Sequence, residues 1–139
     1  MSLVFDSSAM FAFLFDETGA DAVEGLLDDA DVPKYAHAVN LCEVFYRVTL
    51  KQNSTTAAQE ALTTLREAGI VGRNDMDAAL WQDAAKLVAA QRGSGHGLAL
   101  GDAFCVTLAR RLSADIVTSD HAEFDPVAAL GLANVTFIR

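Results

Sequence analysis

The sequence predicts an α/β fold in three layers, with a five-stranded parallel β-sheet that carries helices on both faces. Short apolar runs recur along the chain, and segments whose apolar residues have helical spacing separate them. This alternation is typical of βαβ units, whose crossover helices cover both faces of a parallel sheet. The 139 residues, 52% hydrophobic and 21% charged, match the size and composition of one globular domain. We therefore expect residues 1–139 to form a single domain.

Five apolar runs are expected to form the strands. They lie at residues 3–5, 34–39, 70–72, 116–118 and 135–138. The first run, Leu3-Val4-Phe5, favours β-structure and ends at Asp6, where residues that prefer turns and caps begin. The second alternates loosely between polar and apolar residues after Pro33, and the fourth follows Asp115.

Helical spacing of apolar residues predicts the helices between these strands. They are expected at residues 9–15, 19–30, 55–68, 75–91 and 100–112, with another that begins at Asn40 and a short one after Asp125-Pro126. Asn40 is a favoured N-cap residue, and Pro126 would occupy the first position of its helix. Gly69 follows the helix over 55–68 as a C-terminal glycine should.

Several classes of protein do not fit this sequence. The longest apolar stretches, such as residues 9–15, are shorter than the roughly 18 residues that a membrane span needs. The first residues lack the basic start, apolar middle and cleavage site of a secretory signal, so we expect a cytoplasmic protein without membrane contact. Cys42 and Cys105 lie in no zinc-ligand pattern, and we expect both to be buried as small hydrophobic side chains.

The net charge of −9 disfavours binding of nucleic acid through a general positive field. A nucleic acid would have to be held locally, through bound cations and a few Arg and Lys side chains.

Four carboxylates stand at positions where a parallel sheet places its ligands. Asp6 ends the first strand and Asp120 follows the fourth, while Glu43 and Asp102 lie in the first turns of helices. Ligands of open α/β sheets bind outside the carboxyl ends of the strands, and the following helices often start at that same edge. We therefore expect the four side chains to converge on one rim.

Each carboxylate also has a purely structural interpretation. Asn40 and Glu43 match a capping box, and Asp102 could be a plain N-cap. Asp6 could close an Asx turn, and Asp120 could cap a turn that reaches Glu123. Taken singly, these roles explain the four acids as well as a functional site does.

The combination of the four acids favours a metal site. Close carboxylates repel one another by about 4 kcal/mol per pair at an effective dielectric constant of 20, so a cluster raises its own pKa values or binds cations. Oxygen ligands without His or Cys favour Mg²⁺ or Mn²⁺ over zinc. Such a site can activate water and stabilise the charge that develops at a phosphodiester.

The sequence resembles the PIN-domain family, and within it the VapC-like toxins of type II toxin–antitoxin systems, across essentially its whole length. The segments that carry the resemblance are Leu3–Ala9, Asn40–Val44, Leu98–Ala103, Leu108–Leu112 and Ile116–Asp120 with Phe124 after it. The resemblance implies a PIN-like domain over residues 1–139 that hydrolyses RNA phosphodiester bonds with Mg²⁺, or with Mn²⁺ in its place. It also implies a cognate antitoxin protein and a homodimer.

Carried over by position, Asp6, Glu43, Asp102 and Asp120 would be the catalytic and metal-binding quartet. Asp6 and Asp102 would bind the metal directly, while Glu43 and Asp120 would complete its shell or position the attacking water. Ser7 or Thr118 could orient neighbouring carboxylates through hydrogen bonds.

Contacts to RNA are expected from Arg47, Arg92 and His96, with Lys51 and Arg110 as further candidates. Arg47 could instead pair with Glu43 across one helical turn.

Two other functions remain open at this stage. One is a non-catalytic PIN-fold module that only binds, in which the clustered acids are structural. The other is phosphoaspartyl transfer, which also places an Asp after the first strand. A dehalogenase-like hydrolase would have a second Asp where this chain has Ser8, and a receiver domain would have paired acids after its first strand, which are absent.

Overall fold

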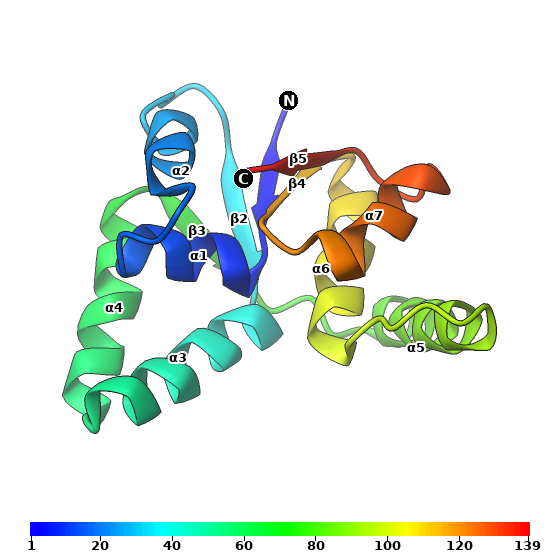
Figure 1. Ribbon diagram of the computed structural model, residues 1–139, viewed down its shortest axis with the longest axis horizontal. Coiled ribbons are helices and arrows are strands. Elements are labelled where there is room, and N and C mark those ends of the chain that lie inside the picture. Colours follow the sequence, from blue (N-terminus) through cyan, green and yellow to red (C-terminus); the bar gives the residue numbers. More distant parts are fainter.

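The computed structural model describes all 139 residues and contains one five-stranded, all-parallel sheet (Figure 1). The strands are β1 (Leu3–Phe5), β2 (Lys34–His37), β3 (Ile70–Arg73), β4 (Asp115–Thr118) and β5 (Val135–Phe137). Their order across the sheet is β3-β2-β1-β4-β5, so β1 lies at the centre. The fold class predicted from the sequence is confirmed, and each strand lies within two residues of its expected bounds.

Seven helices connect the strands or follow them. They are α1 (Ser7–Leu14), α2 (Ala20–Leu27), α3 (Ala38–Gln52), α4 (Thr55–Glu67), α5 (Ala78–Gly93), α6 (Leu100–Leu112) and α7 (His121–Ala129). Side chains cap several of their first turns, with Ser54 accepting from the Ala57 N–H at the start of α4. None of the helices combines the length and apolar character needed to cross a membrane.

α5 begins at Ala78 and not at residue 75. Two expected helix caps are also wrong. Asn40 does not cap α3, because the helix begins earlier and the ring Nδ1 of His37 accepts the Val39 N–H at 3.0 Å. The last helix starts before Asp125-Pro126, because Asp120 Oδ1 accepts the Glu123 N–H at 3.0 Å and caps it. Pro126 therefore lies inside α7, where its missing N–H leaves one carbonyl of the first turn without its helical partner.

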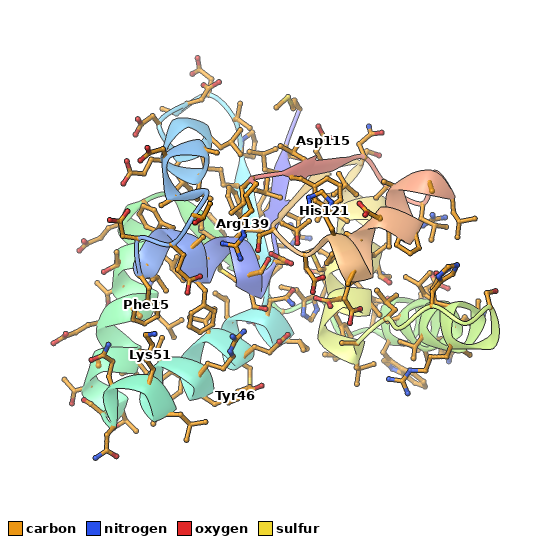
Figure 2. All side chains as sticks on the ribbon, viewed as in Figure 1. Phe15, Tyr46, Lys51, Asp115, His121 and Arg139 are labelled. Carbon is orange, nitrogen blue, oxygen red and sulfur yellow. The ribbon has the colours of Figure 1, made fainter.

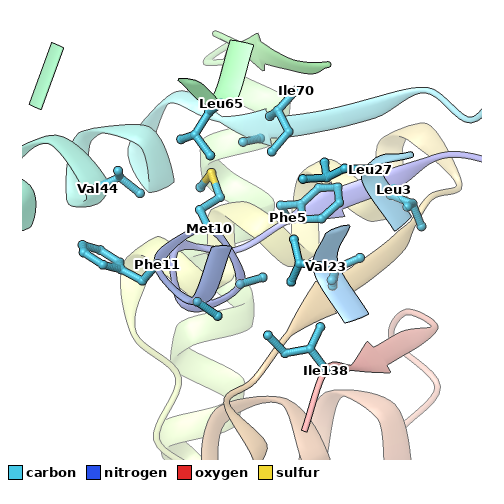
Figure 3. Packing of buried hydrophobic residues seen from close by; sticks show 14 of the residues in the cluster. Leu3, Phe5, Met10, Phe11, Val23, Leu27, Val44, Leu65, Ile70 and Ile138 are labelled. Atoms are coloured by element: carbon cyan, nitrogen blue, oxygen red, sulfur yellow. The ribbon is translucent and has the colours of Figure 1, made fainter. Parts of the chain in front are cut away.

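The sheet has two buried faces, and alternate residues of each central strand point to opposite ones. Leu3 and Phe5 pack with residues of α1, α2, α3 and α4 on one face (Figure 3). Val4 packs with residues of α5, α6 and α7 on the other. This division gives the three layers and holds the first turns of the helices against the ends of the strands.

The cysteine expectation is half right. Cys105 is buried within α6, whereas Cys42 is exposed on the surface of α3.

An ion-pair network ties the end of α6 to the connection between β3 and α5. Arg111 binds both oxygens of Asp77, at 2.6 and 2.8 Å, and reaches Asp75 at 3.1 Å. Arg73 binds the same Asp75 carboxylate at 2.8 and 3.0 Å. The two hydrogen bonds from Arg73, together with the one from Arg111, lower the pKa of Asp75 from 3.8 to about 2 despite partial burial.

Replacing Asp75 with asparagine is expected to lower the free energy of unfolding by about 1 kcal/mol at pH 7, because two arginines lose the carboxylate that they share. The loss is small because water screens these partly exposed ion pairs. A depressed pKa contributes stability above the ordinary value and loses it as the carboxylate takes up a proton. The difference from the wild type should therefore shrink as the pH falls from about 4 towards 2. Urea unfolding at pH 7 and pH 3 measures it, and a constant difference at both would contradict this account.

Candidate metal centre

The carboxyl ends of β1 and β4 form the floor of the candidate site. These strands are paired, with Phe5 opposite Val117, so the residues that follow them, Asp6 and Asp120, leave the sheet side by side. The N-terminal parts of α3 and α6 lie at the same edge (Figure 1). Asp102 is in the first turn of α6, whereas Glu43 is in the second turn of α3 and not in the first as expected, because α3 begins at Ala38. The structure thus brings the four predicted acids to one rim.

Asp6 is the most enclosed of these acids, with only 1% of its surface exposed. Its Oδ1 accepts the Ala9 N–H at 2.9 Å, which caps α1, and the Ser8 hydroxyl at 2.8 Å. Its Oδ2 accepts the Thr118 hydroxyl at 2.5 Å. Burial raises the pKa of Asp6 to about 6, although these hydrogen bonds oppose the shift. Asp6 therefore has a structural role, as the cap of α1, and also lies at the rim.

Thr118 and Ser8 join the two strand ends. Their hydroxyl oxygens lie 3.2 Å apart, Thr118 accepts the Asp120 N–H, and Ser8 accepts the Ser119 N–H, both at 3.0 Å. Thr118 orients Asp6 as expected, whereas Ser8 was missed by the sequence analysis. Its position two residues after Asp6, in a helix first turn where a hydroxyl can reach back, is the signal that could have identified it.

Glu43 is held by side chains and not by a capping box. Its Oε1 accepts from Asn40 Nδ2 at 3.3 Å and its Oε2 from the Ser7 hydroxyl at 3.4 Å. The capping-box interpretation fails because α3 begins at Ala38, so Asn40 already lies inside the helix. The expectation that Ser7 orients a carboxylate fits this contact.

Asp102 is buried in the first turn of α6 and accepts no hydrogen bond from the protein. It is not the N-cap, which is Ala99. Burial raises its pKa to about 8, and the charges of Asp6, Glu123, Glu43 and Asp120 add to the rise. A buried carboxylate among four others needs either a proton or a cation.

Three of the rim carboxylates approach closely enough to share an ion. One oxygen each from Asp102, Asp120 and Glu123 lies within 4.8 Å of the others. Oxygens on opposite sides of a Mg²⁺ ion are about 4.2 Å apart, so small side-chain movements suffice to close this set around one. Glu123, which also accepts the Ala99 N–H at 2.9 Å, was not among the predicted site residues. Its spacing of three residues from Asp120 indicates a shared helix face.

A family model described as "PIN domain" matches residues 3–130. The chain belongs to the PIN domain family. No curated protein sequence matches it.

Solved structures share the fold of this PIN domain at low sequence identity. VapBC2 from Rickettsia felis, bound to a DNA fragment from its promoter, aligns with a TM-score of 0.73 and 14% identity over 99% of this chain and 98% of the other. VapBC-1 from nontypeable Haemophilus influenzae gives 0.71 and 14% over the same shares. VapBC-5 from Mycobacterium tuberculosis, a member of the VapBC family of toxin–antitoxin systems, gives 0.55 and 22%, again over 99% and 98%.

The basic residues expected to contact RNA form no ion pair with the acidic rim of this PIN domain. The Arg47 guanidinium stacks over Phe11 at 4.2 Å and forms no ion pair, so the proposed pairing with Glu43 is wrong. Lys51 lies over Phe15 at 4.8 Å (Figure 2). Arg92 and His96 are exposed near the end of α5 and form no ion pair.

The donor set of the rim suits a hard divalent cation. Every candidate ligand is a carboxylate oxygen, with no His or Cys among them. Cys105 lies one turn beyond Asp102, but burial holds the pKa of its thiol well above the ordinary value, so it stays a neutral thiol. Mg²⁺ and Mn²⁺ therefore fit the site, and zinc fits poorly.

Proposed function

We propose that this PIN domain is a Mg²⁺- or Mn²⁺-dependent ribonuclease and the toxin component of a toxin–antitoxin pair, working as a single domain in the cytoplasm. The observation that carries the proposal is Asp102, a buried carboxylate with no hydrogen-bond donor and four other carboxylates around it. No hydrogen-bond donor of the protein contacts it, and the four carboxylates around it oppose its negative charge, which supports a site for a cation.

The residues divide into ligands and groups that hold them. Asp102, Asp120 and Glu123 have oxygens close enough to share the ion, and Asp6 lies next to them, fixed by Thr118 and Ser8. Glu43 completes the shell or positions the attacking water. A bound Mg²⁺ or Mn²⁺ supplies the positive charge that activates water and stabilises the charge at the scissile phosphate. In the reaction, an oxygen of water bonds to phosphorus, one P–O ester bond breaks, and the leaving oxygen takes up a proton.

The acidic net charge is compatible with an RNA substrate because it is unevenly distributed. Of the 19 acidic residues, seven lie in residues 16–31, a segment without Lys or Arg, and five form the rim. The rest of the chain carries seven acids against ten Lys and Arg. With a cation bound at the rim, the surface outside residues 16–31 is close to neutral or basic, and Arg47, Lys51 and Arg92 remain candidate contacts for phosphates.

An antitoxin partner and a homodimer are part of the proposal. The similar VapBC structures are complexes of toxin–antitoxin systems, and they cover nearly the whole of this chain. Exposed apolar side chains on α3 and α5, including Tyr46, Leu50 and Trp81, are compatible with further protein contacts.

The test is cleavage of a mixed pool of structured RNAs by the purified protein with Mg²⁺ or Mn²⁺, beside an EDTA control and Asp6→Asn purified by the same route. Discrete fragments that need the metal and vanish in the variant are expected. Equal fragments from the wild type and the variant would show a contaminating nuclease. An inactive wild type that still binds Mn²⁺ would leave a binding module in place of an enzyme.

A further inference from the structure

The carboxyl group of Glu43 occupies space that exists because residue 101 is glycine. A Cβ atom built on Gly101 would overlap Glu43 Oε1 and lie 3.0 Å from Cδ, closer than the neighbours of Cβ atoms normally come. Gly101 is in the first turn of α6 and has no positive φ angle, so its backbone conformation does not call for glycine. Glycine also weakens a helix relative to alanine. The close approach of Glu43 is thus the feature at this position that needs glycine.

Asn40 holds the same carboxyl group from the other side. Its Nδ2 donates to Glu43 Oε1 at 3.3 Å and to the Gly101 carbonyl at 3.1 Å, which links α3 to α6. If the Asn40 amide were flipped, its Oδ1 would face Glu43 Oε1 and the Gly101 carbonyl, which are both acceptors. Asn40 is completely buried, and its Oδ1 has no hydrogen-bond partner, which is unfavourable for folding. A buried Asn40 amide whose oxygen has no partner destabilises the fold, so its presence indicates a role beyond packing.

We propose that Gly101 and Asn40 are positioning residues that form a seat for the Glu43 carboxylate and so set its place in the metal centre. The seat joins α3 to α6, the helix that carries Asp102. A side chain at position 101, next to Asp102 in the sequence, would meet the Glu43 carboxyl group and so displace it. The proposal rests on the rim being a metal site, as the proposed function requires.

The test is Mn²⁺ binding by the metal-free, full-length protein, measured by isothermal titration calorimetry for the wild type and for Gly101→Ala. We expect Gly101→Ala to bind Mn²⁺ at least about 10-fold more weakly, as loss of groups that orient metal ligands usually does. Its unfolding temperature without metal should equal or exceed that of the wild type, because alanine favours the helix. Gly25→Ala is the matched control, since Gly25 lies in helix α2 with nothing within 4 Å of its Cβ position.

A double-mutant cycle identifies Glu43 as the residue through which Gly101 acts. Glu43→Ala frees the space at position 101, so adding Gly101→Ala in that background should not change Mn²⁺ affinity further. Asn40→Asp keeps the volume but replaces the donor with a second carboxylate, and it should weaken Mn²⁺ binding when Glu43 is present.

Three outcomes would overturn the seat. Gly101→Ala could bind Mn²⁺ as the wild type does, its effect could persist without Glu43, or the wild type could bind no Mn²⁺, which would also remove the proposed function. If the wild type binds Mn²⁺ and the Gly101 and Glu43 variants behave as expected, but the protein cuts no RNA, the ribonuclease proposal fails and the seat proposal stands.

Discussion

Asp102→Asn is expected to lower the rate of metal-dependent RNA cleavage by more than the roughly 10- to 100-fold that loss of an outer-shell partner costs. Asparagine keeps the shape of the side chain but removes the charge that would face the proposed ion. Asp6 and Glu43 are poorly placed to replace it, because Asp6 is held by three donor groups and Glu43 by two. Single-turnover cleavage of one labelled RNA with saturating Mg²⁺ measures the effect.

Asp83→Asn is the matched control for that experiment. It makes the same chemical change at an exposed position of α5, away from the rim, and should leave the rate unchanged. An Asp102→Asn protein that cuts RNA as fast as the wild type would exclude Asp102 from the metal centre.

The convergence of the four acids could be predicted because it depends on the direction of the strands. Parallel strands deliver Asp6 and Asp120 to one edge, and this edge follows from the order of apolar runs in the sequence alone. The same reasoning places Asp102 in the first turn and Glu43 in the second turn of helices that start at this edge.

The parts that could not be predicted depend on local competition between side chains. His37 caps α3 in place of the better cap residue Asn40, because a ring nitrogen accepts as well as an oxygen once the fold has buried it there. Asp120 outcompetes Asp125 as the cap of α7, and that choice turns Glu123 towards the rim. Ser8 and Gly101 act through three-dimensional proximity to residues of other elements, which apolar periodicity does not encode.

The same Asp102→Asn substitution is expected to stabilise the metal-free protein by at least about 1 kcal/mol at pH 8, since one pKa unit corresponds to about 1.4 kcal/mol. Burial and the neighbouring carboxylates raise the folded-state pKa of Asp102 from 3.8 to about 8. A raised carboxyl pKa means that the unfolded chain loses its proton first, so stability falls as the pH rises from about 4 to 8. Asparagine has no such proton, and the gain should therefore be largest at pH 8 and small near pH 5.

Urea unfolding at pH 5.5 and 8 in EDTA, followed by the same titrations with Mn²⁺, measures this effect. The ion binds only the folded state and should restore stability to the wild type at pH 8, by an amount that grows with its concentration. Asp102→Asn should gain much less from Mn²⁺. A variant that is more stable than the wild type and still inactive would show that its lost activity is not a failure to fold. A variant less stable than the wild type at pH 8 without metal would mean that the Asp102 charge is balanced inside the protein, which would remove the main argument for a cation at the rim.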